Sequence, residues 1–575
     1  MTSTERDLPL RAAAEAWLAD DPDPASREEL LALLDDGAEL EDRFSGPLRF
    51  GTAGLRGPLR AGPNGMNLAV VRAAAAGLVR WLGSAASTPA ASTAAASTAA
   101  ASTPAASTPA ASTAASSTAA ADDRPLVIGY DARHGSHAFA VETARVATGA
   151  GRRALLLPRP LPTPVLAFAV RRHGAAAGVM VTASHNPPQD NGYKVYLADG
   201  AQLVPPADAA IEHAIREVGP LADVPLGPPG EVLTDEIVRD YVDAALQVVE
   251  PGVPRELSVA YTPMHGVGRE VFTATLAAAG YPAPFVVAEQ AEPDPDFPTV
   301  AFPNPEEPGA TDLLLALAAR EGADIAIAND PDADRCAVAF QRDGVWRQLR
   351  GDEVGALLAD HLMRRGARGR YATTIVSSSL LSRMCADRGL PYGETLTGFK
   401  WIVRAGDDLV YGYEEALGYC VAPGMVRDKD GITAALLVCE LAAGLKAELR
   451  TLGDRLDELA LRYGVHATDQ LSVRVDDLDE IATAMATIRS RPPAELLDEP
   501  VTAIEDRLPE SDVLILRAGP SRVVVRPSGT EPKLKAYLEV VEPVADGDIA
   551  GARERAAASL AALRTETATA LGLPN

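Results

Sequence analysis

The chain has 575 residues, of which 47% are hydrophobic, and its 79 acidic residues against 53 basic ones give a formal net charge of −26. This length exceeds what one hydrophobic core supports and predicts several domains of about 150 residues each. The negative charge excludes a broad surface for nucleic acid or anionic membranes, because the field of the whole molecule repels both. An anionic ligand would therefore need local groups of Arg and Lys.

The cysteines and the hydropathy pattern indicate in which cellular compartment the protein is expected. The N-terminal MTSTERDLPL lacks the apolar segment of a signal peptide, and no uncharged apolar run reaches the ~18 residues of a membrane span. The chain has four cysteines: Cys336, Cys385, Cys420 and Cys439. None of them forms a C-x-x-C pair, which argues against a disulfide framework and against a zinc site. We expect a cytoplasmic protein.

Strand-like and helical patterns alternate along most of the chain. Residues 84–121 contain only Ala, Ser, Thr and Pro, and we predict a flexible surface insertion there, although its alanines leave partial helix possible. Elsewhere, apolar runs such as RPLVIGYDAR, SVAYTPMHGVG, DIAIANDPDADR and TTIVSS are typical of strands, and TDLLLALAAR and GALLADHLMRR have helical periodicity. This alternation predicts α/β layers with mixed sheets, whereas ATDQLSVRV and the runs after it predict an α+β end. The predicted domains are 1–233, 234–350, 351–462 and 463–575.

Two arginines in the N-terminal part follow turn-forming residues. Arg56 lies in the glycine-rich RFGTAGLRGPLRAG and could reach a phosphate. Arg133 follows a predicted strand in GYDARHGS.

A serine lies in a polar loop after a small apolar run. The strand predicted at 175–181 leads to Ser184 and His185, the chain breaks at Asn186-Pro187-Pro188, and we predict another turn at Asn191-Gly192. Lys194 follows ten residues after the serine. Ser184 is a candidate nucleophile, and a simple hydrogen-bonded loop serine is the alternative.

Three alternating carboxylates follow the next predicted strand in NDPDADR. Asp330, Asp332 and Asp334 repel one another unless a cation neutralises them, and hard oxygen ligands favour Mg²⁺ or Ca²⁺. The EF-hand spacing is absent. A magnesium site that shares its ligands with a phosphate is the first interpretation, and a solvated acidic turn is the second.

Paired glutamates and a lysine between acids mark the third part of the chain. Glu414 and Glu415 follow the strand-like DLVYGY and could clasp sugar hydroxyls, and Lys429 stands between Asp428 and Asp430. Flanking acids keep a lysine protonated, so Lys429 favours a general acid over a base. A salt-bridged loop is the alternative.

The last cluster is RPSGTEPKLKAY, at 526–537. A small turn of Ser528, Gly529 and Thr530 can present backbone N–H groups between Arg526 and Lys533, which suits a dianionic phosphate. It is not a Walker loop. An ordinary hairpin turn is the alternative.

Together these stretches resemble the α-D-phosphohexomutases of the phosphoglucomutase/phosphomannomutase superfamily. The similar segments are FGTAGLRG, TASHNPPQDNGYK, DPDADR, TGFKWI, EEALGY, RDKDGI and RPSGTEPKLK, which span residues 50–535. The resemblance implies four domains around a central cleft, three α/β and the last α+β, each with one loop in the active site. It also implies a monomer or weak dimer that acts on sugar phosphates.

The resemblance also implies roles for individual residues. Ser184 would carry a phosphoryl group and bind one Mg²⁺ together with the three aspartates, and a hexose 1,6-bisphosphate would be intermediate and activator. Lys429 would be the general acid/base, with Lys194, Arg56 and His185 beside the transferring group; a structural role for His185 is the alternative. The residues implied to bind substrate are Arg133, Arg335, Thr397, Gly398, Lys400, Glu414, Arg526, Ser528, Gly529, Thr530 and Lys533.

One departure bears on the substrate. Many phosphoglucomutases have EES in the sugar loop where this chain has EEA, with Ala416 third. Glucose phosphate is the first expectation and mannose phosphate a second substrate. The alternatives are a phosphopentomutase, a serine phosphatase that would release free phosphate, and a non-catalytic sugar-phosphate sensor.

Overall fold

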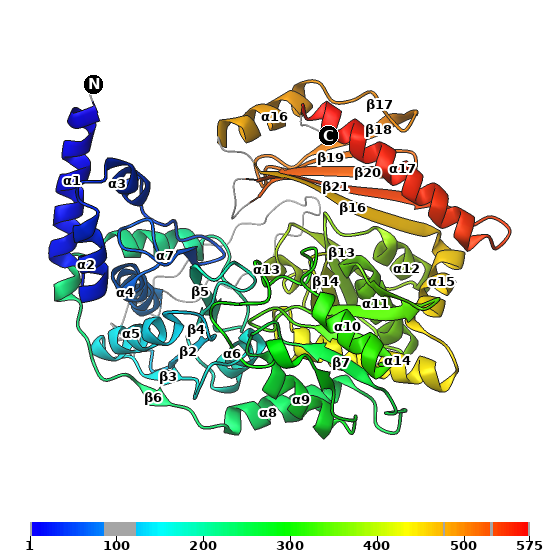
Figure 1. Cartoon of the computed structure of the whole chain (residues 1–575), viewed down its shortest axis with the longest axis horizontal. Helices are drawn as coiled ribbons and strands as arrows, with labels where there is room; N and C mark the ends of the chain where they lie inside the picture. Colours follow the sequence, from blue (N-terminus) through cyan, green and yellow to red (C-terminus); the bar gives the residue numbers. More distant parts are fainter. Residues whose placement is uncertain (1–2, 86–121, 475–477, 529–532, 573–575) are drawn as a thin grey trace, which may run out of the picture.

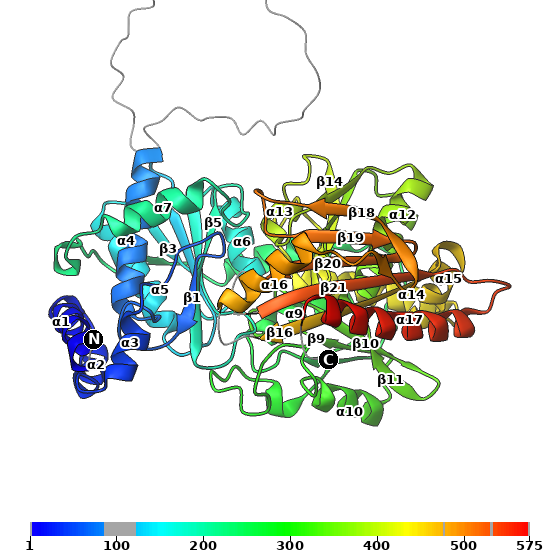
Figure 2. The same cartoon turned by 90° about the horizontal axis from the view of Figure 1, so that it is seen from above.

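The computed structural model describes residues 3–85, 122–474, 478–528 and 533–572, and Figure 1 shows four sheets in chain order. Three of them are mixed and flanked by helices, and the last is antiparallel. The prediction of three α/β units and a C-terminal α+β unit is confirmed. A separate group of helices at the N-terminus lies at one edge of the molecule (Figure 2): α1 (Ser3–Asp20), α2 (Pro24–Ala32) and α3 (Gly37–Phe44).

The first sheet has the strand order β1-β5-β4-β2-β3-β6. Its strands are β1 (Leu55–Pro58), β2 (Leu126–Tyr130), β3 (Ala154–Leu156), β4 (Ala177–Val181), β5 (Asp190–Leu197) and β6 (Glu231–Val232), with helices α4 (Leu68–Ala85), α5 (Ser136–Gly149), α6 (Thr163–Arg172) and α7 (Ala207–Arg216). Strand β4 is parallel to β2 and antiparallel to β5. The loops after β2 and β4 therefore leave the same edge of the sheet.

The second and third sheets repeat this plan with fewer strands, in the orders β11-β10-β9-β7-β8 and β13-β12-β14-β15. The second comprises β7 (Val259–Thr262), β8 (Phe285–Val286), β9 (Ile325–Ala328), β10 (Ala337–Arg342) and β11 (Val345–Gln348), with α8 (Glu236–Ala245), α9 (Gly268–Ala278) and α10 (Asp312–Glu321). The third comprises β12 (Arg370–Thr374), β13 (Tyr392–Thr395), β14 (Leu409–Glu414) and β15 (Gly418–Cys420), with α11 (Gly351–Arg364), α12 (Leu380–Arg388), α13 (Phe399–Ile402), α14 (Gly431–Ala447) and α15 (Leu452–Tyr463).

The C-terminal sheet has the order β16-β21-β20-β19-β18-β17. It comprises β16 (Val465–Arg474), β17 (Glu495–Leu496), β18 (Glu499–Asp506), β19 (Leu514–Ala518), β20 (Ser521–Pro527) and β21 (Lys533–Glu542), with α16 (Leu478–Ser490) and α17 (Ile549–Ala570). One face packs against these helices, and the other packs on the third sheet through Ile515, Val524 and Val376.

One continuous apolar core joins the three α/β units. It runs from Val127 and Leu166 through Tyr261 to Tyr411 and Leu436, all of which are fully buried. Shared packing of this kind fixes neighbouring units relative to one another, because close-packed interiors do not deform continuously. The loops at the sheet edges are therefore held on one rigid body.

The strand expected at TTIVSS ends at Thr374, the end of β12, where a turn follows. Ser84 and Ala85, the first residues of the predicted insertion, belong to α4, and the rest of it lies outside the described residues. One local prediction is wrong. The turn expected at Asn191-Gly192 is part of β5, where both residues pair with β1. A Cβ on Gly192 would lie 2.5 Å from the Thr182 carbonyl oxygen, so close strand packing explains this glycine. No helix among the described residues has the length and hydropathy to cross a membrane.

Candidate active site

Ser184 lies in the loop between β4 and β5 and is almost completely buried. Its φ of 53° is in the left-handed region, which is costly for a residue other than glycine and is typical of functional loops. The Thr182 hydroxyl accepts a hydrogen bond from the Ser184 N–H at 2.9 Å. The Ser184 Oγ donates to Asp330 Oδ2 at 2.9 Å and lies 3.3 Å from His185 Nδ1.

The serine loop is held by a buried arginine. Arg133 donates to four backbone carbonyl oxygens of this loop: Ser184 at 2.7 Å, Asn186 at 2.5 Å, Pro187 at 2.8 Å and Asp190 at 3.2 Å. The other side of its guanidinium faces Asp131 at 3.4 Å and the Phe297 ring at 4.9 Å. This side chain braces the serine loop, and the contact with substrate stays a prediction.

The three aspartates of the acidic turn converge, as the metal hypothesis requires. Each of Asp330, Asp332 and Asp334 is fully buried and offers an oxygen within 4.8 Å of the others. Burial, together with the other two carboxylates, raises the pKa of Asp330 well above its usual range. Such crowding disfavours three ionised groups unless a cation joins them.

Two lysines from different domains lie against this triad. Lys194 Nζ is 2.7 Å from Asp332 Oδ2 and 3.1 Å from Asp334 Oδ2, and Lys429 Nζ is 2.8 Å from the same Asp334 atom. Although burial opposes the charged form, the carboxylates raise the pKa of both lysines. Both side chains therefore remain cationic.

The donor set fits Mg²⁺. Asp332 Oδ1 and Asp334 Oδ1 are buried and have no hydrogen-bond partner within the described ranges, although buried polar atoms are normally paired. Hard carboxylate oxygens in a small cluster are the ligands Mg²⁺ uses when it also binds a phosphate. The Ser184 hydroxyl at 2.9 Å from Asp330 lies where a phosphoserine oxygen could complete that set.

His185 is adjacent to the serine and lies among cationic side chains. Burial, and then the nearby Arg335 and Arg56, lowers its pKa well below the usual value. The imidazole is therefore neutral at physiological pH. Arg56, at the start of β1, donates to the Asn186 side chain at 3.0 Å, so it too contacts the serine loop.

Arg335 connects the predicted sugar loop at Glu414–Ala416 to the aspartate triad. Its backbone N–H donates to Asp330 Oδ1 at 3.0 Å, and its guanidinium donates to the Ala416 carbonyl at 3.0 Å. Burial raises the pKa of Glu414, at the end of β14, to about 7. The neighbouring Glu415 turns away and accepts hydrogen bonds from Ser377 and Thr374 at 3.1 and 3.3 Å. Glu414 is therefore the glutamate of the pair left for a ligand.

A lysine from the third unit reaches the first. Lys400 in α13 donates to the Thr52 hydroxyl, and burial lowers its pKa to about 8. Thr397 and Gly398 precede this helix and are half-buried, and Gly398 has a φ of +108°, which favours glycine.

The predicted phosphate cradle lies between β20 and β21. Arg526 is in β20 opposite Lys535, and the Ser528 N–H donates to the Lys533 carbonyl at 2.8 Å. Gly529 and Thr530 lie outside the described residues.

Sequence reasoning missed several supporting side chains. The Thr163 hydroxyl donates to Asp332 Oδ2 at 2.6 Å, and the Tyr196 hydroxyl donates to Asp428 Oδ2 at 2.7 Å, which links β5 to the lysine loop. Thr52 belongs to a motif that the sequence did single out, but Thr163 and Tyr196 carry no local signal.

Comparison with known families agrees with this arrangement. The four phosphoglucomutase/phosphomannomutase domain profiles match in order: α/β/α domains I, II and III at residues 96–220, 239–344 and 350–463, and the C-terminal domain at 472–555. The chain belongs to the phosphoglucomutase/phosphomannomutase family. It is an isomerase that transfers a phosphoryl group within its substrate.

The relatives carry three different substrate names. A "Probable phosphomannomutase" of Haemophilus influenzae is 47% identical over 427 residues, covering 72% of this chain and 87% of that protein. A phosphopentomutase of Pongo abelii is 32% identical, covering 94% and 93%. A phosphoglucomutase of Staphylococcus aureus is 32% identical, covering 88% and 92%. The solved structure of the Paramecium phosphoglucomutase parafusin, at 16% identity and a TM-score of 0.65 over 92% of this chain and 97% of that one, shares the fold.

Proposed function

We propose that the protein is a phosphoglucomutase that interconverts glucose 1-phosphate and glucose 6-phosphate through phosphoserine 184 and glucose 1,6-bisphosphate, and that it also accepts mannose phosphates. The contact that carries the proposal is the hydrogen bond from the Ser184 hydroxyl to Asp330, in a triad that Lys194 and Lys429 flank. The four cysteines are buried and unbridged, which suits the cytoplasm as its compartment.

The side chains of this chain account for the proton movements. When the bisphosphate returns a phosphoryl group, the bond between phosphorus and the sugar oxygen breaks and a bond to Ser184 Oγ forms. Lys429, whose cation lies 2.8 Å from Asp334, supplies a proton to the leaving sugar oxygen. The serine proton passes to the neutral imidazole of His185, whose Nδ1 lies 3.3 Å from Ser184 Oγ. Mg²⁺, held by the three aspartates, would polarise the phosphoryl group and offset its charge.

The remaining side chains would bind the substrate. Glu414 would accept hydrogen bonds from sugar hydroxyls, and Lys400 would contact the sugar or its phosphate. Arg526, Ser528 and the N–H groups of the following turn would hold the phosphate that is not transferred, since such a turn beside a guanidinium suits a dianion. We assign Arg133 to positioning of the serine loop.

A phosphopentomutase is the second candidate. Ala416 follows the two clasp glutamates and provides no hydroxyl to a hexose, and the Pongo abelii relative that spans nearly the whole chain has that name. A pentose has fewer hydroxyls to satisfy, so the missing contact would matter less.

Initial rates with glucose 1-phosphate, mannose 1-phosphate and ribose 1-phosphate test the proposal, with Mg²⁺ and a trace of the matching bisphosphate present. We expect the highest kcat/KM for glucose 1-phosphate; a preference for ribose 1-phosphate would transfer the assignment to the pentose reaction. Ser184→Ala should abolish turnover of every sugar, and residual turnover near the wild-type rate would refute the phosphoserine. Chelation by EDTA should silence the enzyme and added Mg²⁺ should restore it.

A further inference from the structure

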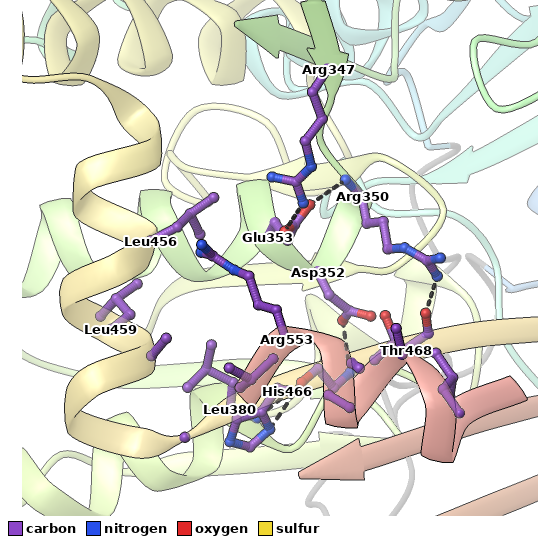
Figure 3. A pocket seen from close by; sticks show the side chains of 18 residues that line it. Arg347, Arg350, Asp352, Glu353, Leu380, Leu456, Leu459, His466, Thr468 and Arg553 are labelled. Atoms are coloured by element: carbon purple, nitrogen blue, oxygen red, sulfur yellow. Dashed lines mark hydrogen bonds and ion pairs between the residues drawn. The ribbon is translucent and has the colours of Figure 1, made fainter. Parts of the chain in front are cut away.

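A cavity of about 230 Å³ lies where the third unit joins the C-terminal unit (Figure 3). Its walls come from α11, α12, α15, β16 and α17. Gly464, which connects α15 to β16, and the first residues of β16, Val465 and His466, line it directly. Nothing in the phosphoryl transfer proposed above uses this cavity.

The walls and the mouth of the cavity differ in chemistry. Leu380, Leu456, Leu459 and Leu560 make the walls apolar. Arg347, Arg350 and Arg553 also line it, and their side chains are between one third and just over one half exposed. Two carboxylates line it as well: Glu353, which is paired with Arg347, and the buried Asp352. Each guanidinium already has a hydrogen-bond or ion-pair partner in the chain. Because a guanidinium has five N–H groups, further donors remain for a ligand. The His466 ring, with Nδ1 3.1 Å from Glu539, completes the lining, and its Nε2 has no hydrogen-bond partner in the described part of the chain.

We infer that this cavity is a binding site for a small amphipathic carboxylate, whose apolar body lies among the leucines and whose carboxylate meets the arginines. The volume exceeds the roughly 150 Å³ of an engineered apolar cavity that takes up benzene, so a body of about six to eight carbons fits. Guanidinium groups pair with carboxylates through two parallel N–H donors, which makes arginine the matching cation.

The cavity is connected to the sugar loop by hydrogen bonds. Ser378, in the wall of the cavity, is held by two hydrogen bonds. Its N–H donates to Asp352 at 2.7 Å, and its hydroxyl donates to Glu539 at 2.7 Å. The adjacent Ser377 hydroxyl donates to Glu415, next to the clasp residue Glu414. A ligand that fixes β16 against α11 therefore acts on the elements that hold the clasp and the C-terminal sheet together, and we expect it to change KM for the sugar phosphate.

Octanoate is the probe, and its binding to the full-length protein is measured by titration calorimetry and by the shift in Tm. We expect saturable binding that raises Tm, since a ligand specific for the folded state stabilises it. The neutral 1-octanol should bind more weakly. Inorganic phosphate, which would occupy the catalytic cradle, should not displace octanoate.

Two arginines of α17 give a matched pair of variants. Arg553, at the cavity, pairs with Asp457 at 2.5 Å, and Arg555, outside it, pairs with Glu542 at 2.6 Å. Arg553→Gln should weaken octanoate binding about fivefold, as expected for one partly exposed charge contact, while Arg555→Gln should leave it unchanged. Asp457 keeps Arg342 at 2.8 Å, so Arg553→Gln retains a local ion pair.

A variant that fills the cavity with a larger side chain provides a second test. Ala557→Phe, at an exposed position that lines the cavity, should abolish octanoate binding and any effect of octanoate on KM while it keeps mutase activity. Absence of saturable binding, equal affinity in all variants, equal binding of 1-octanol or displacement by phosphate would each overturn the inference. None of these outcomes depends on which sugar the enzyme prefers.

Discussion

Replacement of Arg133 by lysine separates two roles for this residue, substrate contact and support of the serine loop. The side chain is 1% exposed and donates to four carbonyl oxygens between Ser184 and Asp190. Lysine keeps the charge beside Asp131 but concentrates its donors at one nitrogen, so it cannot reproduce the planar fork. Arg133→Lys therefore tests the fork without removing the cation.

The expected magnitude follows from the contacts that are lost. If lysine keeps two of the four bonds, loss of the others, at about 1.5 kcal/mol or more each for a charged donor, destabilises the loop by about 3 kcal/mol. A shift of about 1 Å in the nucleophile costs about a hundredfold in rate. We therefore expect kcat to fall by about two orders of magnitude, with KM for the sugar phosphate nearly unchanged.

Steady-state kinetics and the mass of the intact protein after incubation with bisphosphate measure these effects. Arg152→Lys is the control, because Arg152 is also largely buried and bonds the Arg124 carbonyl at 2.7 Å, at the opposite end of β2 from the site. It should retain kcat. If Arg133→Lys instead raised KM with kcat intact, the arginine would contact the substrate phosphate, as the sequence had suggested, and the positioning role would be refuted.

Three further changes test the site. Lys429→Met should lower kcat by about a hundredfold or more, as loss of a general acid does, and single-turnover transfer from bisphosphate measures it; an unchanged rate would exclude the proton donor. Because burial raises the pKa of Glu414 to about 7, its carboxylate ionises only near neutrality; kcat/KM should fall as pH drops through this value, and Glu414→Gln should remove that limb from the pH profile. Ala416→Ser should raise the ratio of kcat/KM for hexose over pentose about tenfold, and an unchanged ratio would show that the clasp hydroxyl does not set the substrate.

Apolar runs before loops predicted the central strands well, but short edge strands had no comparable signal. Strands β2, β7 and β9 coincide with runs that the sequence singled out. Strand β1 reads LRGP, with a glycine and a proline that weaken strand patterns, and forms because β5 pairs with it from far along the chain. The same long-range pairing overrides the turn preference of Asn191-Gly192, since tertiary contacts outweigh local propensity.

Most of the side chains that the sequence singled out lie together in the structure, but the sequence did not reveal their pairings. Short sequence motifs mark the three aspartates and Lys429 as candidates, because the acidic residues in each motif are close together in the sequence. That Lys194 and Lys429 share one oxygen of Asp334 depends on strand β5 of the first sheet meeting a loop from each of the second and third units. The direction of Arg133 was equally hidden, because a short segment after a strand does not reveal on which side of the loop the side chain lies.

The charge balance of the site links the metal to the phosphate. Three carboxylates of the triad face three cationic side chains within 4 Å: Lys194, Lys429 and Arg335. Lys429 also lies 3.8 Å from Asp428 and Arg335 lies 3.4 Å from Glu306, so the unphosphorylated cluster has no excess of positive charge. Phosphorylation of Ser184 adds roughly two negative charges, and in a buried site unpaired charge is strongly disfavoured. A divalent cation at the free oxygens of Asp332 and Asp334 cancels that excess, whereas another lysine would cancel only half of it. On the proposed phosphoserine mechanism, this balance predicts that a site with three cations needs a metal ion once the serine carries its phosphate.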